Sequence, residues 1–223
     1  MHPVGFEEIK KALEAKIDDA IAKSRFQGKV FVKLSTRSPK DAPFRTAKFK
    51  TFKKELGEEW IQKFHYDVQD FEELPRCIKE AASQICSAKC MAVSNGAEAL
   101  ELLATSDRVH FDLDEALQNT YLVNTKLIVR EWEDIPIHYE LRGFVRNRKL
   151  NALTQYFSTC FFPWITVDDW RAIKTRVLHF YENVARLLPV DHCVIDFVVM
   201  KDEVKIVELN PFGLKAGPGL QSK

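Results

Sequence analysis

The segment DHCVIDFVVMKDEVKIVELNPF, residues 191–212, constrains the fold of this chain more than any other. Two apolar runs rich in β-branched residues, Cys193 to Met200 and Val204 to Leu209, flank the polar residues at 201–203. Alternating apolar runs on both sides of a short polar turn are typical of an antiparallel pair of strands. The segment therefore predicts a β-hairpin with Asp202 at the centre of its turn.

A hairpin with that centre places Asp196 directly opposite Glu208, with their Cβ atoms roughly 4.5–5.5 Å apart. Asn210 follows Glu208 by two residues, so strand alternation keeps it on the same face. Two facing carboxylates repel each other, and neutralising one of them is expected to stabilise the bare sheet. A hard cation such as Mg²⁺ reverses the repulsion, because it binds carboxylates together with phosphate oxygens and water. The hairpin therefore points to a metal and nucleotide site.

Charged strand residues more often lie on a solvated face, and this is the alternative interpretation of Asp196 and Glu208. Asp196, however, interrupts the apolar run from Val194 to Val199. Such a run indicates that both faces of the strand are covered, and an unpaired charge there is costly. The run favours a metal or catalytic site over a solvated face.

Composition predicts a soluble globular protein. The 223 residues, 46% of them hydrophobic, suffice for one large domain or two smaller lobes. The 33 basic and 32 acidic residues nearly cancel, which gives no support to a nucleic-acid or membrane partner. No apolar stretch approaches the ~20 residues that span a bilayer, and the first residues do not resemble a signal peptide. A cytoplasmic location is the expectation.

The pattern of elements predicts an α+β fold in which helices cover an antiparallel sheet. We expect a first lobe over residues 1–120 and a second over 121–223. Helices are predicted over Phe6–Ser24, Phe71–Lys89, Ala97–Thr105, Asp112–Asn119, with Asp112 as N-cap, and Asp168–Leu188. Strands are predicted over Val30–Leu34, Thr125–Trp132, Glu140–Arg146 and Lys149–Tyr156, besides the hairpin described above.

Two basic features leave alternatives open. The segment Arg45–Lys54 carries five basic residues between phenylalanines, and a solvated connector is favoured over an anion-binding or nucleic-acid surface. On the strand Glu140–Arg146, alternation places Arg142 where its planar guanidinium suits a phosphate. A cross-strand ion pair at the rim of the sheet is the alternative role for Arg142.

Five motifs resemble a known family when taken together. VFVKLSTRSPKDA, LIVREW, ELRGFVRNRKLNALTQY, VIDFVV and VKIVELNPF occur in this order between Gly28 and Phe212. They closely resemble the cell division cycle protein 123 family, which is an ATP-grasp family. The resemblance implies an ATP-grasp architecture, with ATP held between two α+β lobes and Mg²⁺ bridging its phosphates.

The resemblance also implies roles for particular residues. Lys33 would contact the phosphates, and the loop from Ser35 to Asp41, which includes Lys40, would close over them. The backbone of Arg130, Glu131 and Trp132 would bind the adenine edge. Arg142 would be the phosphate arginine and the one catalytic residue. The family often has aspartate where this chain has Glu208, but Glu-x-Asn is usual in ATP-grasp ligases, so Asp196, Glu208 and Asn210 would form the metal site.

The family acts as an ATP-dependent assembly factor for translation initiation factor 2 and binds its gamma subunit. The resemblance therefore implies an ATP- and Mg²⁺-binding chaperone with a protein partner. An ATP-dependent carboxylate-amine ligase or phosphotransferase with an unknown acceptor is the alternative, since a metal and an arginine also serve phosphoryl transfer. Release of ADP or AMP on addition of a small molecule would distinguish the enzyme from the assembly factor.

Overall fold

The structure, a computed structural model, describes residues 5–23, 28–119 and 124–212 of the chain. Contacts divide the chain into two compact units. The first comprises Met1–Glu73 and Ala82–Glu133, and the second comprises Leu74–Ala81 and Asp134–Lys223. Within the described ranges, no helix is sufficiently long and apolar to cross a bilayer.

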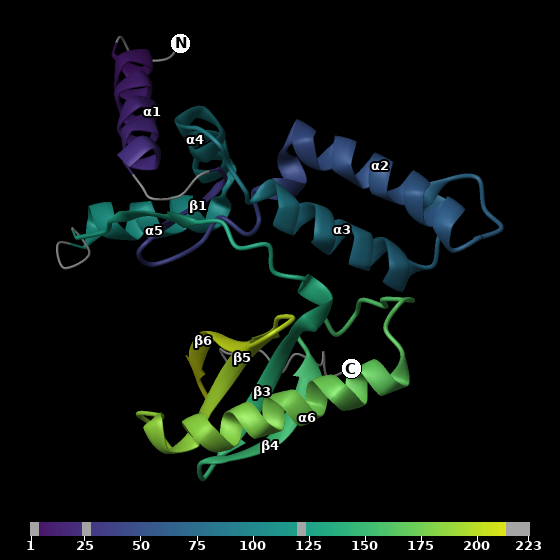
Figure 1. Ribbon diagram of the computed structural model, residues 1–223. Helices are drawn as coiled ribbons and strands as arrows, with labels where there is room; N and C mark the ends of the chain where they lie inside the picture. Colours follow the sequence, from purple (N-terminus) through teal and green to yellow (C-terminus); the bar gives the residue numbers. More distant parts are fainter. Residues whose placement is uncertain (1–4, 24–27, 120–123, 213–223) are drawn as a thin grey trace. The chain divides into compact units, whose positions relative to one another are not determined.

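The first unit is a two-stranded antiparallel sheet with helices packed against it (Figure 1). Val30, Val32 and Leu34 alternate with half-buried residues and share a core with Ile17 and Leu102 from two of the helices. The elements of this unit are α1 (Phe6–Lys23), β1 (Val30–Leu34), α2 (Ala47–Lys63), α4 (Gly96–Thr105), α5 (Asp107–Gln118) and β2 (Leu127–Glu131). Helix α3 (Arg76–Cys90) begins in the second unit and ends in the first.

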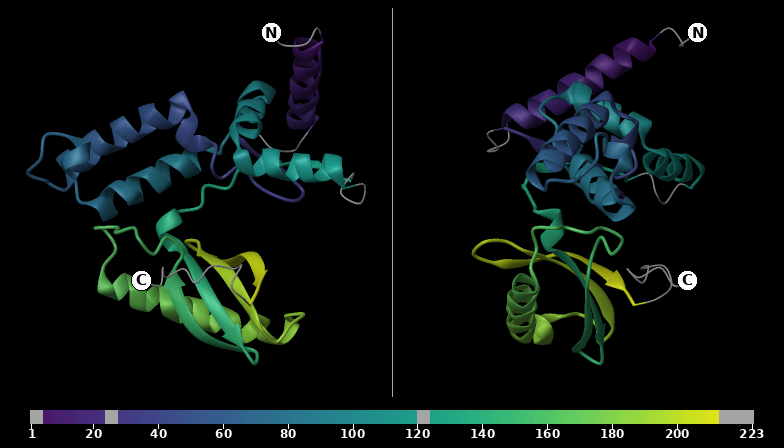
Figure 2. Two further views of the ribbon diagram at one scale, coloured as in Figure 1. Left: turned by 180° about the vertical axis from the view of Figure 1, so that it is seen from behind. Right: turned by 90° about the vertical axis from the view of Figure 1, so that its right-hand side faces the viewer.

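The second unit is a four-stranded antiparallel sheet in the order β4-β3-β5-β6. Its elements are β3 (Glu140–Arg146), β4 (Lys149–Gln155), α6 (Val167–Val184), β5 (Cys193–Val199) and β6 (Val204–Pro211). Helix α6 lies across one face of the sheet (Figures 1 and 2). Ile173 and Val177 of α6 pack with Leu141 of β3 and Phe197 of β5 in one core.

Local sequence explains how these elements begin and turn. Helix α6 starts with a capping box, in which the Thr166 hydroxyl accepts from the Asp169 amide and the Asp169 carboxylate accepts from the Thr166 amide. Between β3 and β4, Asn147 and Arg148 have φ of 51° and 57°, as a two-residue hairpin turn with the twist of the strands requires. The Arg148 side chain forms an ion pair with Asp191, with Nε 2.6 Å from Oδ1.

The predicted α+β fold is confirmed, and the predicted bounds of β1 and β3 match the structure. Three predictions are wrong. The helix predicted over Phe71–Lys89 is divided into a 3₁₀ turn, Phe71–Glu73, and α3, which begins at Arg76. Helix α5 begins at Asp107 with Ser106 as its N-cap, and Asp112 is a buried residue inside the helix. The segment Arg45–Lys54, favoured as a solvated connector, forms most of the first half of α2.

The grouping of strands differs from the expected division at residue 120. Strand β2 follows residue 120 in the chain, yet it pairs with β1 over five residues from Val30↔Glu131 to Leu34↔Leu127. The contacts accordingly group residues as far as Glu133 with the first unit.

Replacing Gly143 by alanine is expected to lower the free energy of unfolding by about 1 kcal/mol, because the added methyl group overpacks the core. A Cβ at Gly143 would lie 2.7 Å from Leu150 Cδ1 and 2.7 Å from Phe197 Cε2. Urea denaturation measures the effect. The double variant with Phe197→Leu should show favourable coupling, because leucine withdraws one of the two clashing atoms. Additive effects would contradict the explanation.

Candidate functional site

Asp196 is a charged residue inside a fully covered strand. All seven residues of β5 are buried, and Asp196 is 3% exposed. A solvated position is therefore excluded. Asp196 pairs with Arg142 on β3 and with Glu208 on β6. Residues that face each other across a sheet share one side of it, so three charged side chains lie together opposite the α6 core.

The pairing of Asp196 with Glu208 agrees with the sequence prediction, but two irregularities produce it. Val199 pairs with Val204, so the centre of the turn lies half a residue earlier than predicted. A regular ladder from that turn would set Asp196 opposite Val207. A β-bulge beside Asp196 leaves Val207 as an extra residue and moves Glu208 into register. The two deviations cancel.

The bulge also decides which way the end of β6 faces. Before it, Val204 and Ile206 pack in the core of the second unit. After it, Glu208 and Asn210 lie on the side of Asp196, and Asn210 Nδ2 donates to Asp196 Oδ2 at 3.3 Å. Bulges commonly re-aim side chains beside functional sites. This bulge turns two polar residues out of the core and toward Asp196.

Arg142 and Asp196 form a buried bidentate ion pair. Nε of Arg142 donates to Oδ1 at 2.7 Å, and Nη2 donates to Oδ2 at 2.8 Å. The two side chains are 12% and 5% exposed. The hydrogen bonds to Asp196 raise the pKa of Arg142 against the opposing effect of burial, and the charges of Asp196, Tyr156 and Glu208 raise it further. The cross-strand alternative for Arg142 is therefore observed, although the pair lies near the middle of the sheet and not at its rim.

Thr154 in β4 and Tyr156, directly after β4, are neighbours of Arg142, and neither was predicted from the sequence as a site residue. The Arg142 guanidinium carbon lies 4.7 Å from the centre of the Tyr156 ring, a cation–π distance. Thr154 pairs with Arg142, and its Oγ1 is buried without a hydrogen-bond partner among the described residues. We call Arg142, Thr154, Asp196, Glu208 and Asn210 the Asp196 face.

The register of β4 explains why Thr154 was missed. Arg146 pairs with Lys149 beside the turn, and a regular hairpin would then set Arg142 opposite Leu153. A bulge at Asn151 moves Thr154 into that place. The side-chain Nδ2 of Asn151 donates to the Arg146 and Lys149 carbonyls, and these bonds stabilise the bulge. The alternation of Leu-Thr-Gln-Tyr was the available signal, but it does not fix the register.

The ligands on the Asp196 face fit a hard cation. Carboxylate oxygens of Asp196 and Glu208 and the carboxamide oxygen of Asn210 are the donors that Mg²⁺ or Mn²⁺ prefers. In the described part of the chain, no group of three His, Cys, Asp or Glu residues could hold a metal alone. Two carboxylates and an amide leave coordination positions for phosphate oxygens and water, as is usual for Mg²⁺. The partnerless Thr154 hydroxyl is a further group that a polar ligand would satisfy.

The predicted phosphate residues Lys33, Ser35 and Lys40 lie in the first unit. Lys33 is half-buried on β1 opposite Ile128, and Lys40 is exposed. The Ser35 hydroxyl accepts from the Lys126 amide at 3.1 Å, and the Ser35 amide donates to the Lys126 carbonyl at 2.8 Å. These bonds join the loop after β1 to the start of β2, so Ser35 already has a structural role.

The predicted adenine-binding residues Arg130, Glu131 and Trp132 lie at the end of β2. The Arg130 guanidinium carbon is 4.8 Å from the centre of the Phe31 ring, and the Trp132 and Phe31 ring centres are 6.4 Å apart. The Trp132 amide donates to the Lys29 carbonyl at 3.1 Å. That amide is therefore engaged within the unit, and a ligand would bond to a neighbouring backbone group.

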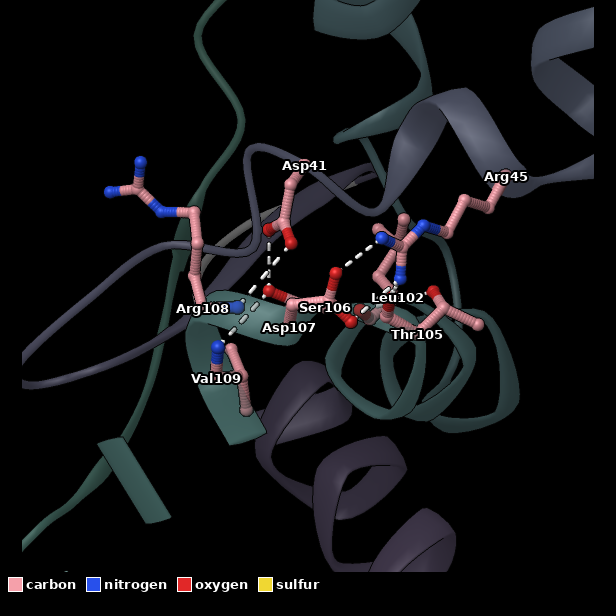
Figure 3. Close-up of polar contacts among 8 residues, drawn as sticks. All are labelled: Asp41, Arg45, Leu102, Thr105, Ser106, Asp107, Arg108 and Val109. Carbon is pink, nitrogen blue, oxygen red and sulfur yellow. Dashed lines mark hydrogen bonds and ion pairs between the residues drawn. The ribbon is translucent and has the colours of Figure 1, made fainter. Parts of the chain in front are cut away.

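The segment after β1 is fixed to the start of α5 (Figure 3). The Asp41 carboxylate accepts from the Ser106 hydroxyl at 2.6 Å and from the Arg108 amide at 3.3 Å. Arg45 forms an ion pair with Asp107, with Nη1 2.8 Å from Oδ1. Burial alone would raise the pKa of Asp41, but hydrogen bonds from Ser106 and from backbone amides outweigh it and hold the pKa below its usual range.

A third attachment lies earlier in the same segment. Arg37 Nη2 is 3.0 Å from Oδ1 of Asp112, whose side chain is 9% exposed, and the Arg37 guanidinium lies over the Phe111 ring. The predicted phosphate-covering loop, Ser35 to Asp41, is thus held on α5 at positions 37 and 41, and Arg45 adds a further contact just after it. Closure of this loop over a ligand would require α5 to move with it or these contacts to break.

The basic segment that begins α2 has partners of its own. Lys48 donates to the Ala92 carbonyl at 3.0 Å, and Lys53 Nζ lies 3.0 Å from Glu72 Oε1. Ion pairs of Arg45 with Asp107, of Lys48 with Glu98 and of Lys53 with Glu72 reduce the positive charge that the segment presents to a ligand.

Comparison with known proteins relates the chain to one family. A sequence model of the D123 family matches residues 76–222. The translation initiation factor eIF2 assembly protein of Danio rerio is 28% identical over 137 residues, which cover 57% of this chain and 38% of that protein. A CDC123-like protein of Acanthamoeba polyphaga mimivirus is 24% identical over 138 residues, covering 57% of this chain and 41% of that protein. The matched part thus spans about two fifths of each relative.

Solved structures show the same fold. Cdc123 from Schizosaccharomyces pombe matches with a TM-score of 0.55 at 18% identity, over 97% of this chain and 69% of that chain. A C-terminally truncated form of the same protein matches with a TM-score of 0.56 at 18% identity, over 96% and 69%. The shared fold is α+β. The family model covers more than half of the chain, and the chain therefore belongs to the D123 family, the family of Cdc123.

Proposed function

We propose that this chain binds ATP with Mg²⁺ at the Asp196 face and takes part in assembling a protein complex. The observation that carries the nucleotide half is the buried juxtaposition of Asp196, Arg142 and Asn210, with Glu208 opposite Asp196 on the neighbouring strand. Burial of charged side chains within a sheet lowers the stability of the folded protein, and such clusters are found most often at functional sites.

In this proposal, the acidic and amide residues of the Asp196 face bind the metal, and its arginine binds a phosphate. Asp196, Glu208 and Asn210 would hold Mg²⁺, which neutralises negative charge on the phosphate oxygens when it is bound. Arg142 would bind a phosphate through the same planar fork that now holds Asp196. Glu208 is exposed, whereas Asp196 is buried, so a ligand would reach the cluster from the β6 side. For Lys33, Ser35, Lys40 and the backbone of Arg130–Trp132, a role in nucleotide binding remains a prediction from the family resemblance.

The assembly half of the proposal rests on the family. One relative is named as an assembly protein for the translation initiation factor eIF2. We expect this chain to act in the cytoplasm with a protein partner of that kind, the gamma subunit of initiation factor 2. Co-elution of the purified chain and gamma subunit, with ATP and Mg²⁺ present, would support this partner. Separate elution at micromolar concentrations would count against it.

Calorimetric titration with ATP, with and without Mg²⁺, tests the nucleotide half. The expected result is binding that requires the metal, because the phosphates and the two carboxylates repel each other without it. Equal heats in both buffers would contradict the site. ADP can replace ATP as a matched control, since it lacks the terminal phosphate.

Chromatography of the nucleotide after long incubation distinguishes the two functional classes. ATP that stays intact would support the assembly role. Conversion to ADP or AMP, stimulated by a small carboxylate or amine, would favour the ligase or phosphotransferase, because an arginine and a metal also stabilise a transferring phosphoryl group.

A further inference from the structure

Both carboxylate oxygens of Asp196 are already engaged. Oδ1 accepts from Arg142 Nε at 2.7 Å, while Oδ2 accepts from Arg142 Nη2 at 2.8 Å and from Asn210 Nδ2 at 3.3 Å. The Asp196 side chain is 5% exposed. These bonds take most of the acceptor capacity of the carboxylate, and a cation that approached Asp196 would meet the positive charge of Arg142 in its present position.

We infer that Arg142 is the internal counter-ion of Asp196 and competes with the metal, so that a divalent cation binds there only weakly until a phosphate group draws Arg142 away. This inference rests on the proposed function and concerns the order in which that site fills. It assigns Arg142 a second role, because the same side chain opposes the cation until a phosphate is present.

Charge explains why the two occupants exclude each other. A guanidinium and a divalent cation on the same carboxylate would repel at short range, and neither is screened by water in a buried site. Arg142 cannot simply withdraw, since an unpaired buried charge is strongly destabilising. A phosphate removes the obstacle, because it offers the guanidinium a second bidentate acceptor of the same geometry.

The surroundings of Arg142 suit such an exchange. The face of the Tyr156 ring supports the guanidinium at 4.7 Å and can do so in more than one orientation of its fork, because a ring face has no hydrogen-bond direction. Arg142 is paired across the strands with Thr154, whose hydroxyl has no hydrogen-bond partner within the described ranges and can bond to a group that arrives. Arg142 can therefore change its acceptor without losing all of its present contacts.

Competition between Arg142 and the cation couples the binding of nucleotide and metal. If a phosphate relieves the competition, then nucleotide and cation raise each other's affinity by the same factor. Without nucleotide, displacement of Arg142 by the cation leaves the guanidinium without a carboxylate, and this cost lowers the affinity for the cation. The protein alone should therefore bind divalent cations weakly, although it carries Asp196, Glu208 and Asn210 on one face.

Binding of Mn²⁺ without nucleotide tests this, with electron paramagnetic resonance of free Mn²⁺ as the readout. Arg142→Gln should bind Mn²⁺ about tenfold more tightly than the wild type, because the competitor is gone. The double variant Arg142→Gln with Asp196→Asn should lose that gain, which would locate the cation at Asp196. Arg148→Gln is the matched control, since it removes an arginine from the exposed pair with Asp191 and should leave the Mn²⁺ affinity unchanged.

Two results would overturn the inference: wild-type protein that binds Mn²⁺ as tightly as Arg142→Gln, or a gain that persists in the double variant. If Arg142→Gln does not unfold cooperatively, Arg142→Lys replaces it, because lysine keeps the charge but cannot engage both oxygens, and a smaller gain is expected. Failure of the wild type to bind ATP with Mg²⁺ would instead refute the proposed function. The two failures are therefore distinguishable.

Discussion

Asp196→Asn is expected to lower the free energy of unfolding by about 3 kcal/mol, because it removes the charge that pairs with a buried arginine. Asparagine keeps one oxygen to accept from Arg142, so the loss should lie at the low end for a broken buried pair. The same change should weaken Mg²⁺-dependent ATP binding by about 100-fold or more, since even residues that only orient metal ligands have effects approaching that size.

The direction of the stability change is opposite to the one expected from the hairpin alone. Repulsion between Asp196 and Glu208 predicted that neutralising one carboxylate stabilises the sheet. In the structure, Arg142 is attracted by both carboxylates, and its pKa is raised by the hydrogen bonds to Asp196 and by the charge of Glu208. The cluster is held by attraction, and Asp196 is its closest anionic partner.

Urea denaturation and calorimetric ATP titration measure the two effects of Asp196→Asn separately. The matched control is Asp202→Asn, the same chemical change at an exposed position in the turn of the same hairpin. The control should leave both quantities unchanged. A variant at Asp196 with wild-type stability would contradict the ion pair, and one with wild-type ATP affinity would contradict the metal site.

Much of the second unit could be predicted because its signals are local. A two-residue turn at Asn147-Arg148 and apolar alternation on both sides were enough to identify β3 and β4. The β5–β6 hairpin followed in the same way. The registers of the strands could not be predicted in this way, because a bulge inserts a residue without a recognisable sequence signal. The bulge at Val207 happened to correct the turn, whereas the one at Asn151 concealed Thr154.

The errors in the first unit have identifiable causes. The packed side of α2 has helical spacing and is formed by Phe49, Phe52, Leu56 and Trp60. The basic residues between them favoured a solvated connector and concealed this spacing. Helix α5 follows α4 with Ser106 as the one residue between them, so no loop composition marked its start. The contacts of Asp41 join segments far apart in the chain and leave no local trace.

Asp41→Ala is expected to lower the free energy of unfolding by about 2 kcal/mol, because the hydrogen bonds that the partly exposed Asp41 carboxylate accepts are lost. Ser106 is 0% exposed, and its hydroxyl would lose its acceptor at 2.6 Å. The start of α5 would also lose a favourably placed anion. Amide hydrogen exchange should become faster across α5 in the variant. Asp114→Ala, at an exposed position of the same helix, is the matched control.

The pH dependence of this difference separates the carboxylate from mere side-chain volume. The pKa of Asp41 is lowered from 3.8, so the folded protein releases the proton more readily than the unfolded chain does. Its contribution to stability is therefore complete above pH 3.8 and is lost as the pH falls through the lower pKa of the folded state. Urea denaturation of wild type and Asp41→Ala should show a difference that is constant near neutral pH and shrinks in acid. A difference that persists unchanged in acid would mean that packing, and not the ionised carboxylate, fixes the loop to α5.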